Sequence, residues 1–477
     1  MDAEFVAAEL MTGDFGQAHF GACDFGDVRL TRRAVKTAEL VMRHPGGTLP
    51  QKLNAEADLD GFYNFANNPK VNHDKVLMGH IEQTRQRMES SPGAPGLKLI
   101  IHDTTEGDYS GLDIDDLGPI GNGGCRGLLL HNVLAYDWDK GEAVGLMGQF
   151  VHRRRRVPKS EGARAKREHP QRESRLWLKG VDAVGDVPEG RRWVNLMDRG
   201  GDSFECLDRQ RSRQQLFVVR SKSNRNIQVP DSSGRWRPRK LHSWARRLTT
   251  LASKTVEVSA NEHQPARTAR VRIAAGAVRV LPPKHPRHGE HSNEPLDLWI
   301  VHVKELDAPR GCEPLEWFLL TNVPTRTKEE ALERVAWYEK RPVIEEFHTA
   351  QKTGCGMELP QFTTRKALEV AIGMLSVVAV QLLRLRDLYR QEDAEQRPAT
   401  DVVDGEYVRV LSAWRWKQAR DDLNVREFLF ALAKLGGHLN RRHDHPPGWL
   451  VLWRGWTKLQ LLVDGAAAGR IARCAET

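Results

Sequence analysis

Long apolar runs, paired cysteines and a signal-like start are all missing from this sequence of 477 residues. No stretch of about eighteen apolar residues occurs, so we expect no membrane-spanning helix and no membrane partner. The N-terminus, MDAEFVAAEL, is too acidic for a secretory signal. The six cysteines show no CxxC or other paired spacing. This excludes a disulfide framework or a zinc ribbon and indicates a reducing, cytoplasmic compartment.

Charge is abundant and unevenly distributed. The chain is 28% charged and 40% hydrophobic, with a net charge of +9, and its length predicts two or three domains. Residues 151–175 carry ten Lys/Arg against three Asp/Glu, and residues 220–247 carry nine against one, with Trp236 and Trp244 interleaved. Such runs are either solvated linkers or surfaces that bind phosphates without reading sequence.

Residues 1–90 are predicted to be helical. Asp27 can cap a helix over about 28–43, a second helix covers about 55–66, and Asn72 can cap a third that runs to about residue 88. The polar face of the first helix includes three arginines: Arg29, Arg32 and Arg33. The pattern fits a small DNA-binding module and fits an ordinary three-helix bundle nearly as well.

Two apolar strands are each predicted to end in an acid, Asp103 after 97–102 and Asp198 after 193–197. Between and after them we expect strands at 128–136, 143–151 and 216–220, and helices at 174–184 and 203–210. The resulting order, β-β-β-α-β-α-β, is that of a ribonuclease-H-like mixed sheet. In that topology the first and fourth strands are parallel neighbours, so the two aspartates would lie side by side at the carboxyl ends. A single strand-terminal Asp, by contrast, more often begins a turn.

A third acid is predicted on a later helix that begins at Pro342. Counting from Glu345, the residues at i+3 and i+7 are His348 and Lys352, so all three share one face. Tyr338 and Arg341 stand just before this helix. A solvated helix with an ion pair is the plain alternative, but three apolar residues on the same segment require it to dock on a core: Val343, Ile344 and Phe347.

Three crowded carboxylates repel one another unless a cation lies among them. Carboxylate oxygens suit hard divalent ions such as Mg²⁺, and two such ions can activate an attacking oxygen and stabilise a leaving oxygen in phosphoryl transfer. Asp103, Asp198 and Glu345 therefore predict a two-metal site.

The remainder of the chain completes a three-part organisation. We expect a β insertion at about 227–314, a strand at 315–322 that contains Trp317, and a long amphipathic helix at 363–388 that packs on the sheet. A polar linker at 391–405 leads to a helical C-terminal part. Its five tryptophans either form an oligomer interface or pack within the same chain, and they are Trp414, Trp416, Trp449, Trp453 and Trp456. The predicted domains are 1–90, 91–390 and 391–477.

Motifs along nearly the whole chain resemble the insertion-sequence-four family of DDE transposases. The family signature Y-x2-R-x3-E-x6-K is met by Tyr338, Arg341, Glu345 and Lys352. Further matches are Gly-Asp with following arginines at 26–33, Asp-Thr-Thr at 103–105, Asp-Arg at 198–199, Phe-Val-Val-Arg-Ser-Lys at 217–222, Leu-Gly-Gly at 435–437 and Leu-Trp-x-Gly-Trp at 452–456. One departure is Pro342, which stands where the family member it most resembles has tryptophan.

The resemblance implies an α/β enzyme with a ribonuclease-H-like catalytic core, a β-strand insertion, a helical N-terminal DNA-binding domain and a helical C-terminal dimerisation domain. It implies the catalytic triad Asp103, Asp198 and Glu345, two Mg²⁺ ions for which Mn²⁺ can substitute, and cut-and-paste transposition through a hairpin end. It also implies a homodimer that joins terminal inverted repeats to target DNA in a bacterial, nucleoid-associated setting. The expected DNA contacts are Tyr338, Arg341, Lys352, His348, Arg220, Lys222, Arg225, Arg29, Arg32 and Arg33, with Trp317 stacking a flipped base.

Two other functions fit the same residues. A nuclease of the same fold would use the three acids but stop at hydrolysis. A non-catalytic regulator of transposition would bind DNA alone, and it would have no need of three metal-binding carboxylates.

Overall fold

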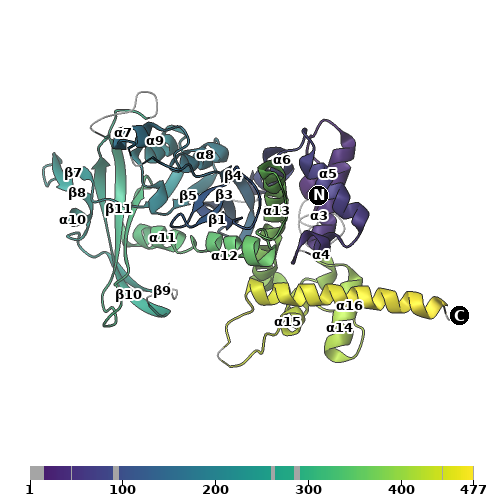
Figure 1. The fold of residues 1–477 in the computed structure, drawn as a ribbon. Helices are drawn as coiled ribbons and strands as arrows, with labels where there is room; N and C mark the ends of the chain where they lie inside the picture. The colour runs from purple at the N-terminus through teal and green to yellow at the C-terminus, as the bar shows by residue number, and fades with distance from the viewer. Residues whose placement is uncertain are drawn as a thin grey trace.

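The structure is a computed structural model that describes residues 15–44, 46–89, 96–158, 160–258, 264–283, 291–442 and 444–475. Its N-terminal region is helical (Figure 1), with α2 (Phe15–Phe20), α3 (Val28–Arg43), α4 (Leu49–Leu53), α5 (Glu56–Asn67) and α6 (His73–Glu89). The Asp27 side chain caps α3 by accepting from the Arg29 amide at 3.0 Å, and Asn72 accepts from the Lys75 amide at 2.9 Å. The three predicted helices are confirmed. The short α2 and α4 were not predicted, because one or two turns show no helical period.

One mixed sheet of twelve strands forms the body of the described chain. The order is β2-β3-β1-β5-β6-β12-β11-β10-β7-β8, with β4 beside β3 and β9 beside β10. The bounds are β1 (Leu97–Asp108), β2 (Gly118–Ile120), β3 (Cys125–Asp137), β4 (Glu142–His152), β5 (Arg192–Met197), β6 (Leu216–Arg220), β7 (Asn226–Pro230), β8 (Trp236–Lys240), β9 (Ala252–Val258), β10 (Arg267–Val280), β11 (Leu296–Glu305) and β12 (Glu316–Thr321).

The centre of the sheet is parallel and its flanks are antiparallel. β1 runs parallel to β5, with His102 opposite Met197, and β5 runs parallel to β6. The predicted parallel pairing of the first and fourth strands is therefore confirmed. β12 is antiparallel to β6 and joins the strands of the predicted insertion to the same sheet. The prediction that the first strand ends at Asp103 is wrong, because pairing with β3 continues as far as Asp108 opposite Gly127.

Helices cover both faces of this sheet. Figure 1 shows α8 (Arg175–Val184) and α9 (Phe204–Ser212) on one side of β1 and β5, with α11 (Lys328–Tyr338) and α12 (Val343–Thr349) on the other. The shorter α7 (Ala163–Glu168) and α10 (Leu241–Ala245) lie in the connections. Successive side chains of β1 alternate between these two helical layers. His102 therefore faces α8, where a Cβ on Gly180 would approach its Nδ1 at 2.7 Å, while Asp103 faces α12.

Helix α13 (Arg365–Arg390) stands between the sheet and the N-terminal helices (Figure 1). The sequence pattern predicted an amphipathic helix, but α13 is buried around almost its whole circumference from Ala367 to Leu388. The reason is that β4 covers one side while α5, α6, α15 and α16 cover the others. Within the described ranges, α13 is the helix that is long and apolar enough to cross a membrane. However, 94% of its most apolar 18-residue segment is buried inside the protein, as in the core helix of a globular domain.

The C-terminal part consists of α14 (Gly405–Trp416), α15 (Val425–Leu435) and α16 (Trp449–Ala475). Three of its tryptophans, Trp449, Trp453 and Trp456, are at most 7% exposed, and Trp456 stacks on Tyr407 with ring centroids 5.1 Å apart. These three rings therefore pack against other residues of the same chain. Trp416 is the one of the five at the surface, with 38% exposure.

Candidate active site

The two aspartates lie on neighbouring parallel strands. Asp103 is in the middle of β1 with its side chain 14% exposed, and Asp198 directly follows β5 with its side chain 35% exposed. Asp198 is also held locally, because its Oδ1 accepts from the Gly200 amide at 2.7 Å and begins a short 3-10 turn. Because the parallel pairing of β1 and β5 ends at His102 and Met197, the next residues of the two strands, Asp103 and Asp198, lie side by side.

A turn between α11 and α12 brings the third acid to the same place. Pro342 precedes the first residue of α12, as predicted for a helix start. Arg341, one residue earlier, points its guanidinium among the acids. Its Nη1 lies 2.5 Å from Glu345 Oε1, and its Nη2 lies 2.9 Å from Asp103 Oδ2 and 4.0 Å from Asp198 Oδ2. One guanidinium thus faces three carboxylates that are far apart in the sequence, and we call Asp103, Asp198 and Glu345 the acid cluster.

The environment of the acid cluster disfavours the ionised form of Asp103. Burial raises the pKa of Asp103 to about 6, and the negative charges of Asp198 and Glu345 add to this rise, while Arg341 opposes it. Burial alone would lower the pKa of Arg341, but the facing carboxylates hold it above its ordinary value. A single positive charge therefore compensates three acids only in part, which leaves the cluster electrostatically suited to a further cation.

Tyr338 and His348 border the acid cluster. Tyr338 is 5% exposed, and burial raises the pKa of its hydroxyl to about 12 although Arg341 and Arg220 lie close by. His348 Nδ1 lies 4.0 Å from Asp103 Oδ2. Burial lowers the pKa of His348 to about 3, helped by the positive charges of Lys352 and Arg341. His348 is therefore neutral near pH 7.

The helical segment that carries Lys352 is irregular. The α-helix ends at Thr349, and Ala350–Gly354 forms a π-helical turn. Lys352 lies inside this turn, so the prediction of two regular α-helical turns is wrong. Its Nζ lies 3.9 Å from Glu358 Oε1, and its positive charge helps to lower the pKa of His348.

Arg220 and Trp317 approach the acid cluster through Tyr338. Arg220 donates to the Glu316 carbonyl at 3.2 Å and lies beside the Tyr338 hydroxyl. Trp317, on β12, is partly buried and meets the Tyr338 ring edge-on, with ring centroids 5.3 Å apart and planes at 67°. Arg220, predicted to contact the transposon-end DNA, and Trp317, predicted to stack a flipped base near the cut, thus both contact Tyr338, which borders the acid cluster.

Several other predicted DNA contacts already have acidic partners. The guanidinium of Arg225 pairs with the buried Asp202, which argues against a free phosphate contact there. On α3, Arg29 pairs with Asp27 at 2.8 Å, and Arg33 pairs with Asp58 at 3.0 Å. Of the predicted DNA contacts in this group, the exposed Arg32 and Lys222 form no ion pair within the described ranges.

The basic run at 151–175 is likewise partly neutralised. Arg153 pairs with Asp116 at 3.1 Å, and Arg155 pairs with Glu161 at 2.7 Å. Arg154 lies between two acids, 3.2 Å from Glu106 and 2.7 Å from Glu173. Some of these partners come from distant strands and loops, so the sequence alone overstates the free positive charge of this run.

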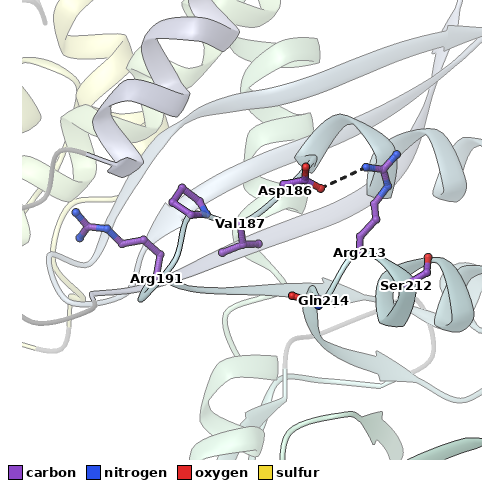
Figure 2. A pocket seen from close by; sticks show the side chains of 7 residues that line it. Asp186, Val187, Arg191, Ser212, Arg213 and Gln214 are labelled. Carbon is purple, nitrogen blue, oxygen red and sulfur yellow. Dashed lines mark ion pairs between the residues drawn. The ribbon is translucent and has the colours of Figure 1, made fainter.

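A pocket of about 250 Å³ lies at the amino ends of β5 and β6, the opposite ends of these strands from the acid cluster (Figure 2). It is lined by the loops that precede β5 and β6: Asp186, Val187, Pro188, Arg191, Ser212, Arg213 and Gln214. Arg213 is engaged by Asp182 at 2.8 Å and by Asp186 at 3.7 Å. Ligands of such sheets bind beyond the carboxyl ends of the strands. The acid cluster, at the carboxyl end of β5, is therefore the stronger candidate.

The donor chemistry of the acid cluster suits a hard divalent ion, because all its ligand atoms are carboxylate oxygens. Within the part of the chain that the structure describes, no three His, Cys, Asp or Glu side chains are close enough to hold one ion between them. The acids surround the Arg341 guanidinium instead. The carboxylate oxygens are ligands that a divalent metal prefers. Arg341 would have to move away before the three carboxylates could close around one ion.

Comparison with known families adds one finding. Residues 12–71 match the family model described as Transposase DNA-binding. The match covers α2 to α5 and includes the arginine face of α3. It supports a transposase with DNA as a partner, and it favours the DNA-binding interpretation of the N-terminal helices over an ordinary helical bundle.

The position of the Arg341 guanidinium among all three acids was not predicted from the sequence. Helix periodicity carries no information on such a contact.

Proposed function

We propose that this protein is a DDE transposase of the insertion-sequence-four family, with a ribonuclease-H-like core, that cuts transposon ends from DNA and joins them to target DNA. The observation that carries the proposal is the convergence of Asp103, Asp198 and Glu345 on one guanidinium. The family match at 12–71 supplies independent support for a transposase.

The reaction consists of successive phosphoryl transfers. Water attacks a phosphate at the transposon end and frees a 3′-hydroxyl, which attacks the opposite strand to form a hairpin. The hairpin is reopened by water, and the 3′-hydroxyl then attacks target DNA. In the synaptic complex we propose a homodimer that brings two ends together.

The acid cluster would hold two Mg²⁺ or Mn²⁺ ions. When bound, these ions activate the attacking oxygen and stabilise the leaving oxygen. Arg341 keeps the three carboxylates gathered before this and then offers a planar fork to a DNA phosphate. Arg220 and the Tyr338 hydroxyl lie close enough to orient the same phosphate. His348 stays neutral near pH 7, because its pKa is about 3, so its proposed role is to offer a hydrogen bond beside Asp103 and not to take up a proton.

Trp317 is proposed to receive a base that is flipped out next to the cut. Flipping costs a few kcal/mol of lost stacking, which an aromatic face partly restores. The edge-on contact of Trp317 with Tyr338, which borders the acid cluster, supports this role, and the Trp317 side chain is partly exposed.

The test is incubation of labelled duplexes ending in the inverted repeat of its own element, with and without Mg²⁺. Hairpin ends and joining to a target plasmid are expected with Mg²⁺. Hydrolysis without hairpins or joining would support the nuclease, and binding without any cleavage in Mg²⁺ or Mn²⁺ would support the regulator. Asp198→Asn is the control for contaminating nuclease, because it should cleave neither strand.

A further inference from the structure

A row of polar side chains crosses the sheet in line with Asp103. Asn132 on β3 is directly opposite Asp103, and Gln149 on β4 is directly opposite Asn132. Directly opposed residues project from the same face of a sheet. Asn132 and Gln149 are at most 3% exposed, and Asn132 Oδ1 accepts from Gln149 Nε2 at 2.7 Å. The row therefore leads from the acid cluster into the interior of the protein.

The row ends on a serine of α13. Ser376 Oγ accepts from Gln149 Nε2 at 2.9 Å and from Gln351 Nε2 at 2.8 Å, and it donates to the Ile372 carbonyl at 2.7 Å. A hydroxyl has one donor and two acceptor positions, so all the hydrogen-bonding capacity of Ser376 is used. Gln149 Oε1 in turn meets His73 Nε2 of α6 at 2.9 Å. We call His73, Asn132, Gln149, Gln351 and Ser376 the Ser376 cluster.

Gln351 is the member that connects this cluster to the site. It is completely buried within the π-helical turn Ala350–Gly354, and its Oε1 lies 3.4 Å from Asn132 Nδ2. Two backbone hydrogen bonds close the turn, from the Cys355 amide to the Ala350 carbonyl at 2.8 Å and from the Met357 amide to the Gln351 carbonyl at 3.1 Å. An inward Gln351 fixes the direction of Lys352, the next residue. π-helical turns are rare and are frequently found at functional sites.

We propose that the Ser376 cluster positions the active site, by fixing the π-helical turn that carries Lys352 against the strand opposite Asp103. This role in catalysis rests on the proposed transposase function. A buried amide that loses its partner must be desolvated without compensation, so the turn can leave its position only by breaking several hydrogen bonds at once. The cluster thus couples α6, β3, β4, α13 and the π-helical turn into one rigid support.

The first measurement is hydrogen exchange of the metal-free protein, which does not depend on activity. Ser376→Ala removes the shared hydroxyl, and amides in 350–357 are expected to exchange at least about tenfold faster. Ser412→Ala is the matched control, since Ser412 is an equally buried helical serine of α14 whose Oγ donates to the Arg409 carbonyl at 2.9 Å. Unchanged protection at 350–357 in Ser376→Ala, or the same increase in Ser412→Ala, would overturn the proposal.

The second measurement is single-turnover cleavage of transposon-end DNA. Ser376→Ala is expected to slow cleavage by about 10–100-fold while the Kd for DNA changes less than about twofold. Ser376→Thr should recover most of the rate, because a helical threonine can make the same bond to the carbonyl four residues earlier. If Ser412→Ala slows cleavage as much as Ser376→Ala does, the loss reflects general destabilisation, and the positioning role is refuted. If the wild-type chain cuts no DNA, the proposed function fails, and the exchange result alone then decides whether the cluster holds the turn.

Discussion

The acid cluster and helix α3 use the same arginine–carboxylate pairing with opposite balances of charge. In the acid cluster one guanidinium, 15% exposed, faces three carboxylates. On α3 and α5 one carboxylate, Asp58, serves two cations, Arg33 at 3.0 Å and Lys36 at 2.5 Å. The first site has surplus negative charge around a mostly buried guanidinium, and the second has surplus positive charge on two cations that are 30% and 55% exposed. This surplus agrees with the proposed partner of each site, a divalent cation for the first and a DNA phosphate for the second.

The largest effect is expected from removing an acid of the first site. Asp103→Asn or Asp198→Asn should reduce DNA cleavage by about a thousandfold or more, which corresponds to about 4 kcal/mol of transition-state stabilisation, with DNA binding retained. Single-turnover cleavage and a binding titration check this. The control is Asp186→Asn in the pocket at the amino ends of β5 and β6, where the side chain is 95% exposed. An equal loss in Asp186→Asn would place the chemistry at that pocket instead.

Arg341→Gln should separate assembly of the acids from metal binding. Without the guanidinium, the metal-free protein is expected to lose about 3 kcal/mol of unfolding free energy, because the buried carboxylate of Asp103 loses its partner. Mn²⁺ affinity, measured by calorimetry without DNA, should rise about tenfold or more, since no protein cation competes for the oxygens.

The matched control for this substitution is Arg334→Gln, which removes another buried arginine, one that is paired with Glu333 and forms no ion pair with the acid cluster among the described residues. It should lower stability without changing Mn²⁺ affinity. Unaltered Mn²⁺ affinity in Arg341→Gln, in a chain that does bind Mn²⁺, would contradict the idea that Arg341 holds the place of a metal.

The raised pKa of Asp103 predicts a pH dependence of stability. Its pKa is about 6 in the folded protein against an ordinary value of 3.8, so the folded state holds the proton more tightly. The unfolding free energy of the metal-free protein should therefore fall as pH rises from 3.8 to 6, by about 3 kcal/mol at most, and stay low above that. Chemical denaturation across this range is the measurement. Asp103→Asn should remove this part of the dependence, and an unchanged profile would refute the assignment.

The smallest effect is expected on α3 and α5. Asp58→Asn frees Arg33 and Lys36 and should strengthen DNA binding at low salt. Each freed cation that reaches a phosphate steepens the slope of log K against log salt by about 0.9. Arg32→Ala removes a cation that has no ion pair among the described residues, so it should reduce the slope by the same amount. If neither substitution changes the slope, α3 does not touch the DNA backbone.

Local patterns were sufficient to predict the main elements. Apolar runs indicated β1 and β5 and the parallel pairing that brings Asp103 beside Asp198, and Asp27 and Asn72 indicated two helix starts. Contacts between distant residues were beyond these patterns. The π-helical turn depends on Gln351 meeting Ser376 and Asn132, and the neutralisation of Arg225 depends on Asp202. Residue spacing reports helix period and strand alternation, but it carries no information on such partners.

The burial of α13 has a consequence for how the chain folds as it is synthesised. His19 of α2 meets Gln381 of α13 at 2.9 Å, 362 residues later, and Lys366 Nζ reaches the Asn68 carbonyl, 298 residues from it. The N-terminal helices α2 to α6 therefore lack their packing partner until residue 390 has emerged, roughly 20–80 s later at ordinary translation speeds. During that delay their apolar sides are exposed to chaperones and to other nascent chains. A ribosome that stalls before α13 would release a chain whose amino-terminal helices lack the partner that completes their packing.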